Sequence, residues 1–233
     1  MRGIRPHEIT DSAGYITVYP DGMEGTWTVG CQDCNFAEAL GADDVPFLQN
    51  LTDHLAESLP VDLERVYVAG YSQGGSLAYL YACTSSKPPA GIAVAGSLIF
   101  RDVGDQCQPA GPLSVLVVHG TEDYMAYYSG FGDDAPYLSV PETVSLFAEN
   151  MNCDPQPIRA DIPDTAGDHT TVTSFRFAGC DPGAGVLHYR VNFGGHVWPG
   201  DTGPWSPVVG LNSKNIEMTR EMVRFFAEVD GGG

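Results

Sequence analysis

Basic residues are scarce in this sequence. Its 233 residues include 11 lysines and arginines against 30 aspartates and glutamates, so the formal net charge at pH 7 is −19. Only two of the basic residues, Lys87 and Lys214, are lysines. So acidic a chain repels nucleic acid and anionic membranes, and neither is expected as a partner. The acidity fits either a solubility device or life in high salt, where screening relaxes the self-repulsion.

Long apolar segments are also lacking. No run approaches the ~18 consecutive apolar residues of a membrane-spanning helix, and the opening MRGIRPHEITDSAG has no apolar stretch of the kind found in a signal peptide. A chain of this length buries roughly 70–75% of its extended surface, enough for a core of its own. The length suits one domain. We expect this domain at 1–230, followed by a frayed glycine tail at 231–233.

The cysteines are few but even in number. An even count in an acidic, glycine-rich chain favours disulfides and an oxidising compartment, so we expect a secreted or periplasmic protein. Six cysteines allow 15 pairings. The three pairs that we favour are Cys153–Cys180, Cys83–Cys107 and Cys31–Cys34. As a redox or zinc motif, the last pair lacks a preceding βαβ unit or a second ligand pair, and we expect no metal site.

Apolar runs and helical periodicities alternate along most of the chain. Near-continuous or period-two apolar runs predict strands, whereas apolar residues three and four apart predict helices. This alternation predicts an α/β fold with a mostly parallel sheet and helices on both faces. Two period-two segments without an intervening helix predict an antiparallel pair at the sheet edge. The predicted strands are 14–20, 65–70, 91–96, 113–120, 170–178 and 186–193, and the predicted helices are 44–59, 74–83, 140–150 and 213–229.

The pentapeptide Gly70-Tyr71-Ser72-Gln73-Gly74 matches the pattern G-x-S-x-G. The pattern alone arises by chance often enough to be weak. Here, however, an apolar strand ends at its first glycine and a helix begins at its last, which is the setting that makes it meaningful. Such a turn leaves the serine above the strand end, close to a helix N-terminus that favours negative charge. Ser72 is therefore the predicted nucleophile.

A nucleophilic serine needs a base, and the base needs an orienting carboxylate. On an α/β-hydrolase sheet these follow the serine in the order acid, then histidine. Asp123 comes just after the strand at 113–120, and His196 lies in the glycine-flanked loop NFGGHVWPG after the last strand. We expect His119 to be a hydrogen-bonded structural histidine and His188 to be a strand residue.

Aromatic residues cluster near the predicted acid and base. Flat rings beside such a site can stack on a phenolic group or a sugar. Trp198, Tyr127 and Tyr128 are therefore candidate substrate-binding residues, with Tyr124 a weaker one. For Trp198, packing that holds the histidine loop is an equal alternative. For Trp205 we expect a packing role.

The motifs G-x-S-x-G-G, H-G-T-x-D and G-G-H-x-W-P-G, in this order, resemble those of the poly(3-hydroxybutyrate) depolymerase-like esterases. This group includes the feruloyl and acetylxylan esterases of carbohydrate esterase family 1. Further matches are VYPDG at 18–22, W-x-x-G-C at 27–31 and DDVPFL at 43–48, so the resemblance runs from about residue 14 to 228. It implies an α/β-hydrolase-type sheet. It also implies that Ser72, Asp123 and His196 form a triad and that the backbone N–H of Gln73 serves the oxyanion hole.

One part of the family pattern is missing. Members of the family begin with a strand ending in His-Gly, which supplies the other oxyanion donor and lies between the strands that correspond to 14–20 and 65–70. This sequence starts downstream of that segment. Relative to the family, we expect either an N-terminally truncated chain or direct closure of the two flanking strands.

Three functions remain open at this point. The first is a serine carboxylesterase that uses an acyl-enzyme and needs no metal or organic cofactor. Its expected substrates are feruloyl or acetyl esters of plant polysaccharide, with poly(3-hydroxybutyrate) or its oligomers as the alternative. The second is an inactive fragment or pseudoenzyme with half an oxyanion hole. The third is a thiol–disulfide protein that uses Cys31 and Cys34.

Overall fold

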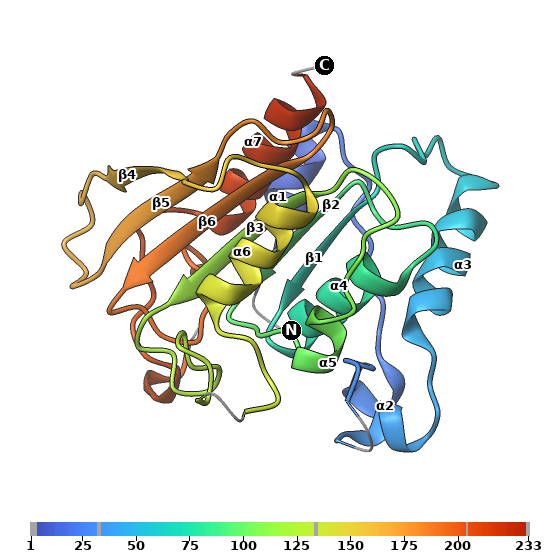
Figure 1. Cartoon of the computed structure of the whole chain (residues 1–233), viewed down its shortest axis with the longest axis horizontal. Helices are drawn as coiled ribbons and strands as arrows, with labels where there is room; N and C mark the ends of the chain where they lie inside the picture. Colours follow the sequence, from blue (N-terminus) through green and yellow to red (C-terminus); the bar gives the residue numbers. More distant parts are fainter. Residues whose placement is uncertain (1–3, 32–33, 133–134, 204, 232–233) are drawn as a thin grey trace.

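A six-stranded mixed sheet forms the centre of the computed structural model, which describes residues 4–31, 34–132, 135–203 and 205–231. The strand order is β1-β2-β3-β6-β5-β4 (Figure 1). Strands β1, β2, β3 and β6 are mutually parallel, whereas β5 and β4 are antiparallel to their neighbours. The bounds are β1 Tyr67–Tyr71, β2 Gly91–Ala95, β3 Ser114–Gly120, β4 Ile158–Ile162, β5 Thr171–Phe177 and β6 Gly185–Asn192. This topology confirms the predicted α/β class with a mostly parallel sheet.

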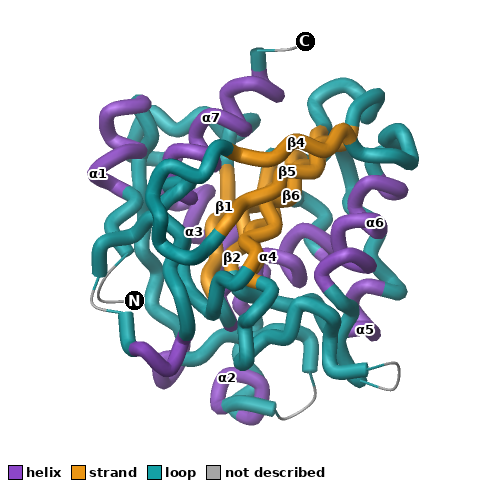
Figure 2. Tube along the Cα trace, turned by 90° about the vertical axis from the view of Figure 1, so that its left-hand side faces the viewer, coloured by secondary structure: helices purple, strands orange, loops and turns teal. Residues whose placement is uncertain are grey.

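Helices cover both faces of the sheet. The amphipathic helix α7 and the short α1 lie on one side of the strands, and α6 lies on the other (Figure 2). The longer helices are α3 Asp44–Ala56, α4 Gln73–Thr84, α6 Val140–Asn150 and α7 Met218–Asp230, and the short ones are α1 His7–Thr10, α2 Phe36–Ala39 and α5 Arg101–Gly104. No helix in the described ranges is long and apolar enough to cross a membrane.

Strand β3 shows how the sequence builds two core layers. Successive side chains of a strand point to opposite faces of the sheet. Val115 and Val117 accordingly join a cluster with α4 and α6, whereas Leu116 and Val118 join a second cluster with α7. All seven residues of β3 are buried, which explains why the segment reads as a continuous apolar run.

Two expectations about the sheet are wrong. The segment 14–20 forms no strand, and its Ile16 and Val18 are 50% and 43% exposed. Within the described residues, β1 pairs only with β2, so the flanking strands do not close up directly. A strand needs a neighbour for its backbone hydrogen bonds, and this segment has none. The antiparallel pairing of the segments 170–178 and 186–193 is confirmed as β5 with β6, although β4 lies outside β5 and forms the edge of the sheet.

Three disulfides join the cysteines, in the pairs favoured from the sequence: Cys31–Cys34, Cys83–Cys107 and Cys153–Cys180. The second links α4 to the loop after α5, and both of its cysteines are buried. In the expected glycine tail, Gly231 caps α7 by donating its N–H to the Ala227 carbonyl. Residues 232 and 233 lie outside the described residues.

We expect the double substitution Cys83→Ser, Cys107→Ser to lower the free energy of unfolding by about 3 kcal/mol. The cross-link closes a loop across a sequence separation of 24 and so restricts the unfolded chain. Urea denaturation of both forms measures the difference. Cys31→Ser, Cys34→Ser is the control, because its loop is much shorter and the loss should be smaller. Equal losses in the two double variants would contradict this assignment.

Candidate active site

Ser72 occupies a strained turn between β1 and α4. Its backbone has φ 53° and ψ −127°, in a region that residues with a side chain rarely adopt. Its N–H donates to the Ala95 carbonyl of β2 at 3.0 Å, which holds the turn to the neighbouring strand. A Cβ at Gly70 would collide with the Gly74 carbonyl, so the strand and helix can approach this closely only with glycine there. The surrounding structure thus holds Ser72 at the turn.

Asp123 lies in the turn after β3, where its carboxylate is buried and fully engaged. One oxygen, Oδ1, accepts hydrogen bonds from the N–H groups of Met125 at 2.9 Å and Ala126 at 2.8 Å. The other, Oδ2, faces the Nδ1 of His196 at 2.8 Å. Burial by itself raises the pKa of Asp123, but hydrogen bonds from His119, His196 and Ala126 outweigh it and hold the pKa well below its usual range. The carboxylate is therefore charged at neutral pH.

His196 connects the carboxylate to the serine. Its Nε2 lies 3.0 Å from the Ser72 Oγ, across 124 residues of sequence. Because the Asp123 carboxylate only accepts, Nδ1 carries the proton, and Nε2 is free to accept the serine proton. The loops of acid and base meet closely, since a Cβ at Gly120 would collide with the Gly194 carbonyl. The structure thus brings Ser72, Asp123 and His196 together in one hydrogen-bonded row.

Tyr71 contacts His196, which was not expected from the sequence. Its hydroxyl donates to the His196 carbonyl at 2.8 Å, and its ring lies 5.0 Å from the imidazole, centroid to centroid. Burial and the nearby Asp123 charge raise the pKa of Tyr71, so the hydroxyl stays protonated and can donate. Tyr71 occupies one of the two variable positions of the pentapeptide, and nothing in the local pattern marks it for this role.

Gln73 contributes through both its backbone and its side chain. As the first residue of α4, it has an N–H without a partner inside the helix. That N–H directly follows Ser72, at the positive end of the helix. The side-chain Oε1 accepts from the Trp27 N–H at 3.1 Å, which ties the turn to the segment ahead of α2.

The predicted substrate-binding aromatics divide into two groups. Trp198 is only 2% exposed and packs in the cluster against α7, with its Nε1 donating to Thr219, which fits the packing alternative and leaves its ring inaccessible to a substrate. Tyr128 packs against the core and its hydroxyl bonds His188 at 2.9 Å. Tyr127 is 41% exposed and meets Phe131 edge to face, so its ring remains accessible.

Of the other two aromatic residues, Tyr124 is accessible and Trp205 is packed against its neighbours. Tyr124 is exposed, and its hydroxyl bonds Glu122. Trp205 packs edge-on against Tyr71, which fits the packing role expected for it.

His188 is a buried strand residue, as expected. Its Nδ1 donates to the Val117 carbonyl at 3.0 Å, which leaves Nε2 to accept from the Tyr128 hydroxyl. Burial lowers the pKa of His188 to about 3, so the imidazole is neutral in the folded protein.

This burial predicts a pH dependence of stability. Below a pH of about 6.5 the unfolded chain binds a proton at this histidine and the folded chain does not. The stability that His188 contributes is therefore present above that pH and falls by about 1.4 kcal/mol per pH unit, down to the folded pKa. Between pH 6 and 4, the free energy of unfolding of His188→Gln should therefore fall by about 1.4 kcal/mol less per pH unit than that of the wild-type protein. Urea titrations at several pH values measure this, and parallel curves for the two proteins would refute it.

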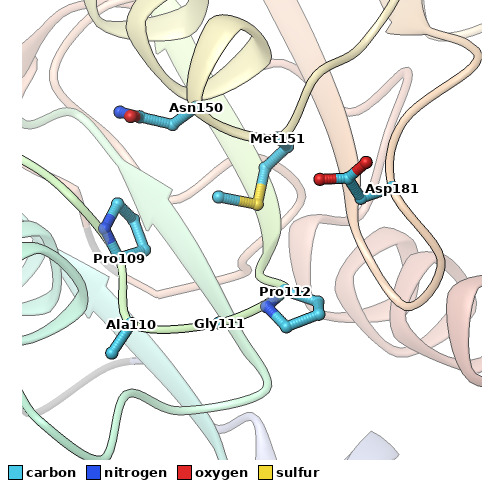
Figure 3. Close-up of a pocket in the computed structure, with 7 residues that line it drawn as sticks. All are labelled: Pro109, Ala110, Gly111, Pro112, Asn150, Met151 and Asp181. Carbon is cyan, nitrogen blue, oxygen red and sulfur yellow. The ribbon is translucent and has the colours of Figure 1, made fainter.

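A separate hollow of about 250 Å³ lies far from these residues. Figure 3 shows Pro109 and Pro112, which precede β3, facing Met151 at the end of α6 and Asp181 in the turn before β6. Ser72, Asp123 and His196 lie at the carboxyl ends of the strands, whereas this hollow is at the amino end of β3. It is therefore no part of the candidate site.

Comparison with known proteins identifies esterases as relatives. No family model matches the sequence. The chain is 29% identical over 229 residues to "Putative esterase NocK" of Nocardia uniformis subsp. tsuyamanensis, covering 92% of this chain and 66% of that protein. It is 26% identical over 198 residues to Feruloyl esterase B of Piromyces equi, covering 79% and 34% of the two chains.

Two further similarities are weaker. The chain is 24% identical over 192 residues to the bifunctional acetylxylan esterase/xylanase XynS20E of Neocallimastix patriciarum, covering 81% of this chain and 25% of that protein. The solved structure of a SOBER1 variant from Arabidopsis thaliana superposes with a TM-score of 0.33 over 41% of this chain and 46% of that one, at 26% identity. That overlap is too partial to bear on fold or function. The chain spans less than two thirds of each curated relative named here, and all three relatives are esterases.

Proposed function

We propose that this chain is a serine carboxylesterase that works through an acyl-enzyme. One observation carries the proposal: the Ser72 hydroxyl, the His196 imidazole and the Asp123 carboxylate form a continuous hydrogen-bonded row, with contacts of 3.0 and 2.8 Å. Such a row can take a proton from serine during attack and return it to a leaving group. The esterase names of the sequence relatives support the same reaction class.

In the proposed mechanism the residues act in two half-reactions. The Ser72 Oγ attacks the ester carbonyl carbon while His196 Nε2 takes the hydroxyl proton, and Asp123 stabilises the resulting imidazolium. The Gln73 N–H donates to the oxyanion. The tetrahedral intermediate collapses, the C–O bond to the alcohol breaks, and His196 protonates the leaving oxygen. Water then attacks the acyl-Ser72 ester by the same proton route and releases the acid.

The proposed oxyanion hole has one donor in this chain, the Gln73 N–H, whereas the family resemblance implies a second donor from a preceding strand. Losing one such donor costs ~10²–10³ in turnover. The competing hypothesis, an inactive chain that keeps the row of residues, predicts no turnover that depends on Ser72.

The proposed substrates are feruloyl or acetyl esters of plant polysaccharide. Relatives named feruloyl esterase and acetylxylan esterase motivate this choice. The accessible rings of Tyr127 and Phe131, in the loop that follows Asp123, could stack on a phenolic or sugar ring. Poly(3-hydroxybutyrate) oligomers are the alternative substrate. Three disulfides fit an oxidising compartment, so we propose that the protein works outside the cytosol.

A side-by-side activity profile tests the proposal. The purified chain and its Ser72→Ala variant are assayed on p-nitrophenyl acetate, methyl ferulate, acetylated xylan and 3-hydroxybutyrate oligomers. We expect hydrolysis that is lost in the variant, with methyl ferulate or acetylated xylan preferred. Turnover that survives the substitution would disprove the mechanism, and a preference for the oligomers would reassign the substrate.

A further inference from the structure

A second buried histidine lies beside the proposed triad acid. His119, near the end of β3, is 1% exposed. Its Nε2 lies 2.7 Å from the Ala126 carbonyl oxygen and 3.3 Å from the Asp123 Oδ2. Its Nδ1 is buried and has no hydrogen-bond partner among the described residues. The mechanism above makes no use of this side chain.

The contacts determine which ring nitrogen carries the proton. The Ala126 carbonyl can only accept a hydrogen bond, so His119 Nε2 must be the donor. The same ring nitrogen lies 3.3 Å from Oδ2 of Asp123, the oxygen that also faces His196 Nδ1. The rings of His119 and His196 therefore both lie against one side of this carboxylate.

The contact of His119 with Ala126 also holds the turn that binds the Asp123 carboxylate. The N–H groups of Ala126 and Met125 both donate to Asp123 Oδ1. Because His119 donates to the Ala126 carbonyl, it holds in place the short turn whose backbone N–H groups bind Oδ1 of the carboxylate. His119 thus acts on Asp123 Oδ1 through this turn, and its ring lies next to Oδ2.

We propose that His119 is a positioning residue that fixes the Asp123 carboxylate in the orientation in which it accepts from His196. This inference rests on the proposed function, because it assigns His119 a role in the same reaction. A carboxylate free to rotate would leave the His196 ring without its orienting partner. The loss should appear in the chemical step and not in substrate binding, since His119 is buried beneath the carboxylate.

The test compares His119→Leu, which removes the donor, with His119→Gln, whose amide N–H reaches about as far as Nε2. With p-nitrophenyl acetate we expect His119→Leu to lower kcat about 10- to 100-fold, because the buried Ala126 carbonyl loses its hydrogen-bond donor and the turn that holds the carboxylate is released. KM should change little, and His119→Gln should recover most of kcat. The matched control is His188→Leu, a buried histidine on the neighbouring strand that does not contact Asp123, for which kcat should stay within about threefold of wild type.

If His119→Leu fails to fold, a second variant, His119→Asn, tests the same role. His119→Asn keeps a polar side chain but is too short to reach Ala126, so kcat should be lost in His119→Asn and kept in His119→Gln if the proposal holds. Unchanged kcat in His119→Leu, an equal loss in His188→Leu, or no recovery in a folded His119→Gln would each overturn it.

The proposal and the mechanism fail in different ways. Turnover that survives Ser72→Ala overturns the mechanism whatever the His119 variants do. A readout without turnover is the downfield proton NMR signal of the hydrogen bond between His196 and Asp123, recorded with His196 protonated. We expect this signal in wild type and His119→Gln and its loss in His119→Leu, and a signal that persists in His119→Leu would refute the positioning role.

Discussion

Replacing Ser72 with alanine is expected to lower kcat for p-nitrophenyl acetate by about 10⁴- to 10⁶-fold. The reason is that, among the described residues, the Ser72 Oγ is the hydroxyl that His196 Nε2 contacts, at 3.0 Å, so the variant leaves only water for the base to activate. KM should change little, because the serine forms a bond only after the substrate is bound. Initial rates over a range of substrate concentrations measure both constants. A loss smaller than tenfold would mean that Ser72 is not the nucleophile.

Ser72→Gly is the matched control for folding. Glycine also removes the hydroxyl, so the activity should be lost to the same degree. The backbone at Ser72 has φ 53° and ψ −127°, which costs of order 1–3 kcal/mol for a residue with a Cβ and much less for glycine. The glycine variant should therefore unfold at a higher urea concentration than the alanine variant. If both variants are inactive and only their stabilities differ, the loss of activity is due to the missing hydroxyl and not to misfolding.

The substitution Asp123→Asn should cost about 10⁴-fold in kcat, comparable to losing a triad carboxylate in serine hydrolases. The amide oxygen of asparagine can still accept from Met125 and Ala126, which directs its NH₂ group toward His196 Nδ1. The imidazole must then accept at Nδ1 and carry its proton on Nε2. In that tautomer it cannot take the proton of Ser72. Steady-state kinetics near neutral pH measure the loss.

Asp44→Asn controls for the removal of a buried carboxylate. Asp44 is buried, and its Oδ2 accepts from the Thr28 N–H and hydroxyl, but it contacts no histidine in the described part of the chain. An asparagine oxygen can keep these contacts, so kcat should stay within about threefold of wild type. Comparable losses in Asp44→Asn and Asp123→Asn would show that a general loss of stability, and not the histidine tautomer, explains the effect.

Local patterns predicted the elements that carry the candidate site. The strand ending near Gly70, the helix after Ser72 and the buried strand before Asp123 all appear close to their predicted bounds. These elements are read from the spacing of apolar residues and from turn residues, both of which act over a few positions. The order of Ser72, Asp123 and His196 along the chain was likewise visible without a structure.

Local patterns failed where a long-range partner decides the outcome. The segment 14–20 has strand composition, but it forms no strand, because no neighbouring strand accepts its backbone hydrogen bonds. Trp198 follows the base by two residues and yet faces the core, because α7 packs over it. His119 is the hydrogen-bonded histidine that was expected, but its partner Ala126, like the contact of Tyr71 with His196, is set by how the loops fold back at the sheet edge and could not be read from the sequence.

The residue types, their order and the local turn at Ser72 follow from the amino-acid sequence alone. Those features depend on neighbours a few positions apart, so they can be read along the chain. The contact of His196 with Ser72 across 124 residues, and the contact of His119 with the turn that holds Asp123, arise only when the whole sheet has formed. The pairing of β3 with β6 brings these loops together, and such pairing depends on the packing of the whole sheet and its helices.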